Sequence, residues 1–167
     1  MANSYKEIIM KKTDSYCFNT VILVVADIEK AERFYQQSLG LRIHSRIRDE
    51  AQTVINSTLE GHDICLLLSC ADPEHGTLSP ASAGVNSLTV VLTVPDVDRL
   101  TQQFVKAGGS LRSGPKDRYW GVRAALVEDP DGHRWMLQTP INPLTDKQIQ
   151  QALKPWIYET IESVCNS

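Results

Sequence analysis

The chain has 167 residues, with 17 Lys and Arg against 20 Asp and Glu, which gives a formal net charge of −3. This length suits one domain, or two small modules that share a core. The acidic balance argues against nucleic acid as a main partner, because phosphate binding needs a basic face. It also gives no support for a polybasic membrane patch. We therefore expect no nucleic-acid partner and no membrane partner.

The cysteines indicate the compartment. Cys17, Cys65, Cys70 and Cys165 form no C-x-x-C pair and have no His partner at zinc-finger spacing. Such a set is typical of reduced thiols in a cytosolic protein. The N-terminal stretch lacks the apolar region of a signal peptide, and the longest clean apolar run, Val21 to Ala26, is too short to span a bilayer. We expect a soluble, cytoplasmic protein.

A repeat dominates the chain. Residues 20–40 and 89–109 align without a gap at an offset of 69. Each copy runs from an apolar, β-branched strand through an Asp, Asp27 or Asp96, into a helix that ends at Gly. Asp is a good N-cap and Gly adopts the left-handed conformation that ends helices. The apolar residues of both helices recur at helical spacing. The sequence thus predicts two copies of a strand followed by a helix.

Three short strands are predicted after each helix. They fall at 41–47, 51–60 and 63–69 in the first copy, and near 110–115, 121–129 and 133–139 in the second. Turn-forming residues separate them. Each copy is therefore a β-α-β-β-β module. Alternation along the strand at 41–47 puts Leu41, Ile43 and Ile47 on one face. Arg42, His44, Arg46 and Arg48 would share the other, as a solvated face or as a basic wall against an acidic ligand or neighbouring subunit.

The predicted organisation has five parts. They are an N-terminal extension (1–15), the first module (16–70), a connection rich in Pro, Ser, Ala and Gly (71–85), the second module (86–140) and a C-terminal helical extension (141–167). In the last part, Thr145 and Gln148 have the form of a capping box. An apolar stripe follows at Ile149, Leu153, Trp156 or Ile157, and Ile161, and Pro155 should kink or split this helix. The stripe should cover either the chain's own sheet or a partner subunit.

Two motifs carry a family resemblance. The D-x-x-x-A-x-x-F-Y-x-x-x-L-G segment from Asp27 and the D-P-D-G-x-x-W-x-L segment from Asp129 resemble the vicinal oxygen chelate superfamily of glyoxalase, bleomycin-resistance and extradiol-dioxygenase-like proteins. The resemblance covers roughly residues 16–140. Residues 117–135 look most like its PhnB-like or bleomycin-resistance-like branch. It implies an α+β fold in which two tandem β-α-β-β-β modules form a cupped mixed sheet, here with an added C-terminal helix, and a homodimer.

The resemblance also implies where metal ligands would stand. Metal-dependent members place His, Gln or Glu at four positions inside the cup. Counting back seven residues from each capping Asp gives Thr20 and Thr89, and aligning the G-H turns at 61–62 and 132–133 gives Cys65 and Met136. Thr and Met are weak, neutral ligands, and Cys is a strong one only when ionised. We therefore expect no metal site of the usual kind and no cofactor.

The cavity lining follows from the same strands. The residues expected to face it are Thr20, Ile22, Cys65, Leu67, Thr89, Val91, Met136 and Gln138. Alternation sends Trp135 and Leu137 to the core instead. Trp120 and Arg123 are expected at the rim, where an indole could stack on a planar ligand and a guanidinium could hold its anionic group. The alternative for Trp120 is burial in a dimer interface.

Three functions remain open at this point. The first is metal-independent binding of a small molecule, planar or anionic, by apolar burial. The second is an enzyme: a lyase, isomerase or dioxygenase with a displaced metal site that recruits His44 or His62, or metal-free acid–base chemistry by Cys65 or Glu60. Glu60 beside its turn also fits a solvated loop carboxylate. The third is a dimerisation module with no ligand. The sequence leaves open whether the cup forms within one chain or between two.

Overall fold

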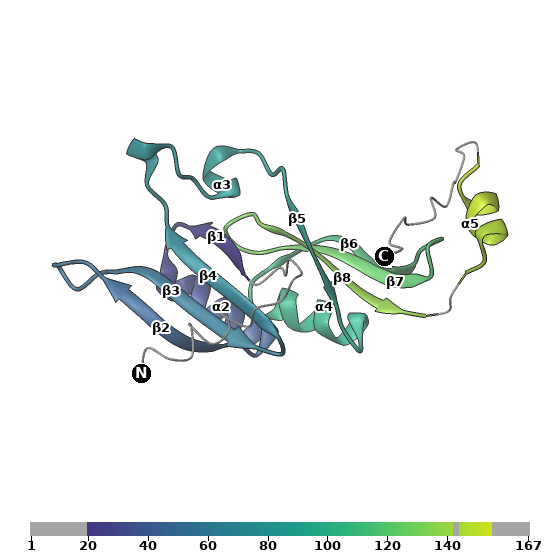
Figure 1. Ribbon diagram of the computed structural model, residues 1–167, viewed down its shortest axis with the longest axis horizontal. Helices are drawn as coiled ribbons and strands as arrows, with labels where there is room; N and C mark the ends of the chain where they lie inside the picture. The colour runs from purple at the N-terminus through teal and green to yellow at the C-terminus, as the bar shows by residue number, and fades with distance from the viewer. Residues whose placement is uncertain (1–19, 142–143, 155–167) are drawn as a thin grey trace, which may run out of the picture.

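The computed structural model describes residues 20–141 and 144–154 (Figure 1). The predicted N-terminal extension and the C-terminal residues from Pro155 onward lie outside these ranges. The first module contains β1 (Val21–Val25), α2 (Ile28–Leu39), β2 (Arg42–Arg48), β3 (Val54–Gly61) and β4 (Ile64–Cys70). The connection holds η1 (Pro73–His75) and α3 (Pro80–Ala83). The second module contains β5 (Thr89–Thr93), α4 (Val97–Lys106), β6 (Ser110–Asp117), β7 (Val122–Glu128) and β8 (Arg134–Pro140), and α5 (Asp146–Ala152) follows.

Each module forms one mixed four-stranded sheet. The strand orders are β1-β4-β3-β2 and β5-β8-β7-β6. In both sheets the first strand runs parallel to the last, and the other neighbours are antiparallel. This confirms the predicted α+β fold of two β-α-β-β-β modules. The helices of the described residues are too short to cross a membrane.

The helix ends follow the local sequence. Asp27 accepts a hydrogen bond from the amide of Lys30 at 3.0 Å, and Asp96 accepts one from the amide of Arg99 at 2.9 Å. Helix α2 ends at Gly40, whose φ of 68° is the left-handed conformation expected there. The predicted capping box of Thr145 is present at the start of α5. These caps are confirmed because they depend only on residues within one turn. The predicted left-handed Gly end is wrong for the second helix, which is capped by Ala107 with φ −74°.

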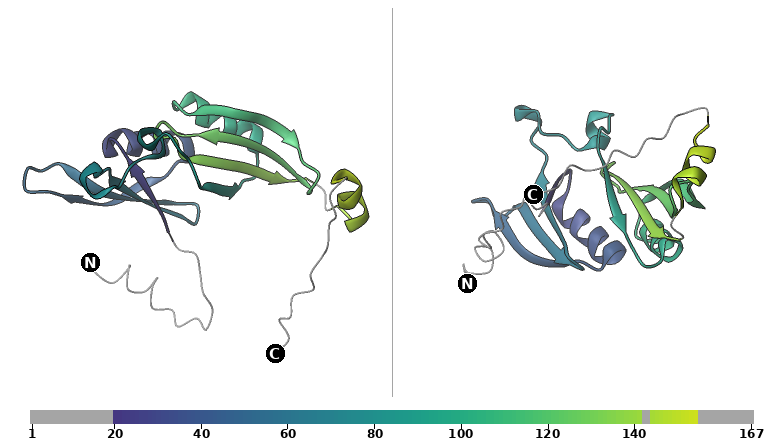
Figure 2. Two further views of the ribbon diagram at one scale, coloured as in Figure 1. Left: turned by 90° about the horizontal axis from the view of Figure 1, so that it is seen from above. Right: turned by 45° about the vertical axis from the view of Figure 1, so that its right-hand side comes forward.

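The two modules share one apolar core (Figures 1 and 2). Each long helix covers one face of its own sheet, and α2 also contacts α4. Phe34 and Phe104 meet edge-to-face with ring centroids 4.9 Å apart. The ring centroids of Tyr35 and Trp135 lie 5.8 Å apart. Trp135 and Leu137 are both buried. The prediction that Trp135 and Leu137 belong to the core is confirmed.

The D-P-D-G turn of the second module forms hydrogen bonds with the first module. Asp129, with its side chain buried, accepts a hydrogen bond from the hydroxyl of Tyr35 in the first module. Asp131 accepts one from the amide of Ala26 at 2.8 Å. Burial and the adjacent Asp129 raise the pKa of Tyr35 well above its usual value, and burial raises the pKa of Asp131 despite the amide of Ala26. The acidic turn therefore links the two modules through the hydrogen bonds of Asp129 and Asp131, which we call the inter-module clasp.

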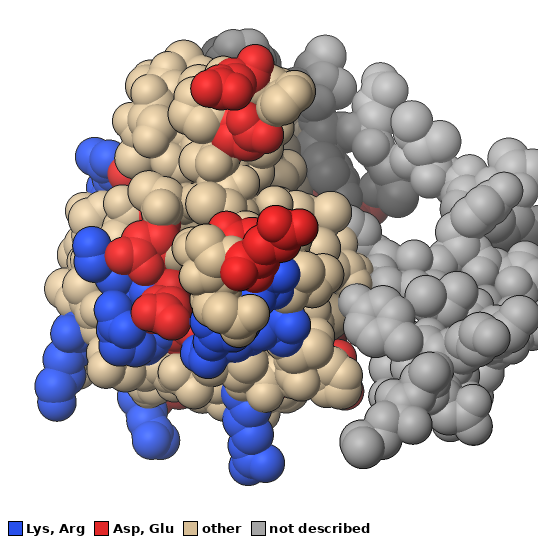
Figure 3. Space-filling model, turned by 90° about the vertical axis from the view of Figure 1, so that its left-hand side faces the viewer, with Lys and Arg blue, Asp and Glu red and all other residues tan. Residues whose placement is uncertain are grey.

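Strand β2 departs from the predicted alternation. A register shift between Ile43 and Ser45 inserts one extra residue, so that the side chains beyond it change faces. Arg46 consequently turns towards α2, where it binds the buried Glu32, and Ile47 is left 57% exposed. The prediction of one basic face that includes Arg46 is therefore wrong. Figure 3 likewise shows Lys and Arg side chains next to Asp and Glu rather than one basic patch.

Candidate ligand-binding site

The face of each sheet that points away from its helix carries the predicted lining. Residues paired across neighbouring strands share a face, so the strand registers define two rows. In the first sheet the row is Ile22, Leu67, Thr58 and Ser45. In the second sheet it is Val91, Met136, Leu126 and Ser113. Ile22 is 61% exposed and Val91 is 54% exposed, so apolar side chains on both faces lie open to solvent.

The structure brings the predicted lining residues together in two groups. Thr20, Ile22, Cys65 and Leu67 lie on the first sheet, where the hydroxyl of Thr20 donates to the sulfur of Cys65 at 3.5 Å. Thr89, Val91, Met136 and Gln138 lie on the second sheet. No strand pairing joins the two sheets within the described ranges. The predicted lining residues are therefore divided between two sheets.

The alignment through the G-H turns needs correction. Val21 pairs with Leu66 and Val90 pairs with Trp135, so the offset of 69 that relates β1 to β5 also relates β4 to β8. Met136 thus corresponds to Leu67, and Cys65 to Arg134. Only His62 and Asp63 connect β3 to β4, whereas residues 129–133 connect β7 to β8. Because the two turns differ in length, aligning their G-H pairs shifts β4 against β8 by two residues.

The corrected positions do not suit a metal ion. Thr20, Leu67, Thr89 and Met136 offer two hydroxyls, a thioether and a hydrocarbon, with no anionic or imidazole ligand among them. Divalent metals of this fold class require imidazole or carboxylate ligands. Across residues 20–141 and 144–154, no three His, Cys, Asp or Glu side chains gather where they could hold a metal ion. The four side chains at these positions therefore do not fit the metal ion that the family resemblance implies.

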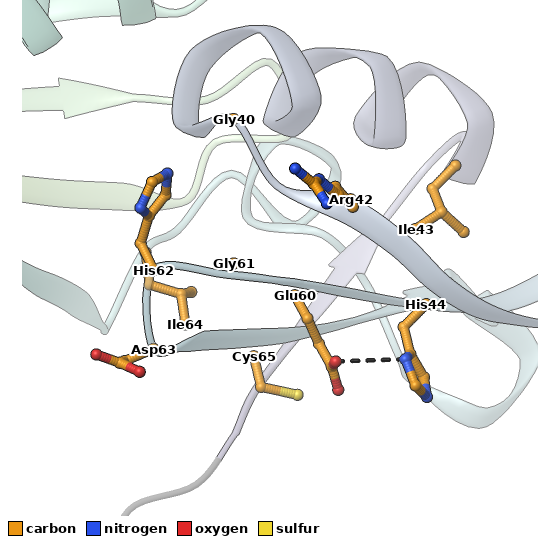
Figure 4. A pocket seen from close by; sticks show the side chains of 10 residues that line it. All are labelled: Gly40, Arg42, Ile43, His44, Glu60, Gly61, His62, Asp63, Ile64 and Cys65. Atoms are coloured by element: carbon orange, nitrogen blue, oxygen red, sulfur yellow. Dashed lines mark ion pairs between the residues drawn. The ribbon is translucent and has the colours of Figure 1, made fainter. Parts of the chain in front are cut away.

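A polar end completes the face of the first sheet (Figure 4). Glu60 lies within β3, paired with Cys65 in β4, and its carboxylate contacts Nδ1 of His44 at 3.3 Å. These side chains and Arg42 line a cavity of about 890 Å³. The interpretation of Glu60 as a loop carboxylate is wrong, because the hairpin turn begins two residues later. A carboxylate on Nδ1 orients an imidazole and leaves its Nε2 available to a ligand.

The rim of the second sheet lies in the turn between β6 and β7. Trp120 is 40% exposed and meets Tyr119 edge-to-face at 4.5 Å. The guanidinium of Arg118 lies 5.8 Å from the centre of the Trp120 ring, within cation–π range. These residues form an exposed aromatic and cationic cluster around Trp120.

Arg123 is not part of that cluster. It binds both carboxylate oxygens of Asp98 in α4, at 2.7 and 2.9 Å, and Asp117 at 3.0 Å. These hydrogen bonds raise the pKa of the Arg123 guanidinium. The structure therefore places Arg123 on the helix-facing side, and Arg118 is the cation beside Trp120. The sequence could not separate the two because both flank the same turn.

Two tandem β-α-β-β-β modules, each with one sheet face covered by a helix and the other open, define the fold class of this chain. The chain belongs to the Glyoxalase/Bleomycin resistance protein/Dioxygenase superfamily, whose family model matches residues 18–137. This confirms the resemblance drawn from the two motifs. The described modules lie almost wholly within the matched span.

Individual proteins are similar to this chain over most of its length. The uncharacterized protein Rv0887c of Mycobacterium tuberculosis is 30% identical over 134 residues, which cover 78% of this chain and 79% of that protein. TioX from Micromonospora sp. ML1 is 24% identical, with a TM-score of 0.59, over 75% of this chain and 100% of TioX. TnmS3 from Streptomyces sp. CB03234, an antibiotic binding protein, is 25% identical, with a TM-score of 0.55. The match covers 77% of this chain and 98% of TnmS3.

Proposed function

We propose that this protein binds a small, planar and anionic molecule without a metal, in a cup formed between two copies of the chain. The observation that carries the proposal is the exposure of Ile22 and Val91 on two separate sheets. Both residues lie on the edge strand of their sheet, on the face away from the helix, and exposed apolar side chains on such a face mark a binding surface. In a two-fold dimer, the first sheet of each copy would face the second sheet of the other, which gives two equivalent cups.

The ligand class follows from the aromatic and charged side chains near the apolar residues of the second sheet face. Trp120 offers a ring for stacking, and Arg118 beside it offers a charge for an anionic group. The similarity to TnmS3, an antibiotic binding protein, supports a small-molecule ligand. We also place the chain in the PhnB-like or bleomycin-resistance-like branch and in the cytoplasm, as its sequence suggests.

Complementation between two variants tests the cup directly. Ile22→Lys and Val91→Lys should each abolish binding of planar aromatic antibiotics, bleomycin included, measured by tryptophan fluorescence and calorimetry. Val85→Lys is the matched control, because Val85 is 70% exposed in the connection, away from both faces. After unfolding and refolding the two defective variants together, about a quarter of the cups should regain both native faces. Cups within single chains would regain none, and that result would refute the shared cup.

Three further measurements test the dimer, the stacking on Trp120 and the binding without a metal. Light scattering should give the mass of a dimer, and Trp120→Phe should weaken binding less than Trp120→Ala, because the smaller ring still stacks. Ligand affinity should be unchanged by a chelator. Binding that requires stoichiometric metal, lost with His44→Ala, would favour the displaced metal site of a lyase, isomerase or dioxygenase instead.

Metal-free acid–base chemistry is the second candidate function. The observation that favours it is the contact of the Glu60 carboxylate with Nδ1 of His44 at 3.3 Å, next to Cys65. An imidazole held in this way can move a proton at a carbon beside a carbonyl group. Deuterium uptake from solvent into α-hydroxyketones, followed by NMR in the presence of a chelator, should then fall at least tenfold in Glu60→Gln. Asp63→Asn on the same hairpin should leave it unchanged, and equal uptake in all three proteins would exclude this function.

A further inference from the structure

A second cavity lies at the junction of the two modules. It has a volume of about 590 Å³ and is bounded by the end of α2, the β3–β4 turn, the end of β5 and the start of α4. Leu39, Ile64, Leu92 and Leu100 contribute apolar walls. Figure 4 shows His62, which also lines it, pointing across the hairpin towards Gly40, away from the side taken by Glu60 and Cys65. The junction cavity adjoins the polar end of the first sheet, with which it shares Gly40, His62, Asp63 and Ile64, but its remaining walls come from α2, β5 and α4.

Ser38 gives the junction cavity an unsatisfied polar group. This residue has no exposed surface, and its hydroxyl has no hydrogen-bond partner in the part of the chain that the structure describes. A buried hydroxyl without a partner costs about 1–3 kcal/mol. Helix α2 could carry Ala at this position without that cost. A ligand oxygen that displaces the side chains covering Ser38 would supply the missing hydrogen bond.

The mouth of the junction cavity offers a cation. Arg99, in the first turn of α4, lines it, and its side chain has no hydrogen bond or ion pair within the described ranges. His62 and Asp63 also lie there, in a two-residue turn with φ values of 51° and 60°. His and Asp adopt this conformation more often than most residues other than Gly. The turn thus presents an imidazole and a carboxylate to the cavity that Arg99 also lines.

We propose that the junction cavity binds a medium-chain carboxylic acid with an oxygen near the far end of its chain, such as a hydroxy or oxo acid. The carboxylate pairs with Arg99, the hydrocarbon body contacts the leucine and isoleucine walls, and the distal oxygen accepts a hydrogen bond from Ser38. Asp63 opposes the ligand charge and so limits affinity. Its apolar walls and Arg99 are not among the residues proposed to line the cup, so the proposal does not rest on the shared cup.

Calorimetry with 10-hydroxydecanoate, decanoate and methyl decanoate tests the site. The hydroxy acid should bind most tightly and the neutral ester at least tenfold more weakly. Arg99→Ala should remove the preference for the acid over the ester. Arg33→Ala is the matched control, because Arg33 lies on the exposed side of α2. Asp63→Asn should tighten binding about threefold, since a like charge is removed.

Ser38→Ala separates a binding role from a structural one. This variant should lose the preference for 10-hydroxydecanoate over decanoate, while its free form unfolds at an equal or higher temperature because an unpaired hydroxyl is gone. Ile22→Lys should bind the acid normally, which distinguishes this site from the cup. The proposal is overturned by absence of binding at millimolar concentration, by equal affinity of the Arg99 and Arg33 variants, or by loss of binding in Ile22→Lys.

Discussion

Glu32→Gln keeps the shape of a buried side chain and removes its charge. Glu32 is 2% exposed and accepts hydrogen bonds from Nε and Nη2 of Arg46, at 2.8 and 2.5 Å, and from the hydroxyl of Ser57 at 2.6 Å. Burial by itself would raise the pKa of Glu32, but the hydrogen bonds from Arg46 and Ser57 outweigh it and hold this pKa below its usual value. The group joins α2 to β2 and β3.

The expected cost follows from the solvent exposure of the two partners. Breaking a buried ion pair by removing one charge costs about 3–5 kcal/mol. The side chain of Arg46 is 34% exposed, so water compensates part of its lost partner. We therefore expect Glu32→Gln to lower the free energy of unfolding by about 3 kcal/mol at pH 7. The double variant Glu32→Leu, Arg46→Met should regain most of the lost free energy of unfolding, because an apolar pair leaves no buried charge without a partner.

Urea unfolding measures this difference, provided that the m-value is the same in both proteins. Because the pKa of Glu32 is lowered in the folded state, its contribution is fully present above the unfolded value of about 4.5 and is lost as the pH falls through the folded value. The difference between wild type and Glu32→Gln should therefore shrink below about pH 4.5. A loss under 1 kcal/mol at pH 7, or a difference that persists unchanged at pH 3, would refute this account of the pair.

Three further predictions concern the turns. Tyr35→Phe removes the hydroxyl that binds the buried Asp129 and should cost about 1.5–3 kcal/mol in urea unfolding; a neutral result would mean that the clasp contributes nothing. Gly132→Ala should cost about 3 kcal/mol, because φ is 88° and the new Cβ would lie 2.7 Å from the amide nitrogen of Ala81; unchanged thermal unfolding would contradict that geometry. Asp63→Gly should stabilise the β3–β4 turn by about 0.5 kcal/mol in the same assay, since glycine relieves the positive φ, and a lower unfolding temperature would contradict this.

The sequence by itself determined the elements of each module. Caps at Asp27, Asp96 and Thr145 involve partners three residues away, and the helical and strand periods are visible within ten residues. The gapless repeat then showed that the same elements occur twice. Residues such as Ile22 and Met136 could be placed on the correct face because β1 and β8 have no irregularity.

The tertiary structure decided what depends on neighbours distant in the chain. A bulge in β2 moved Arg46 towards Glu32 and exposed Ile47, because one inserted residue reverses every later side chain. The unequal turns before β4 and β8 changed which residue corresponds to Met136, since strand pairing and not turn chemistry sets register. Pairing between strands distant in the chain also put the two predicted lining faces on separate sheets, because backbone hydrogen bonds and not local sequence decide which strands become neighbours.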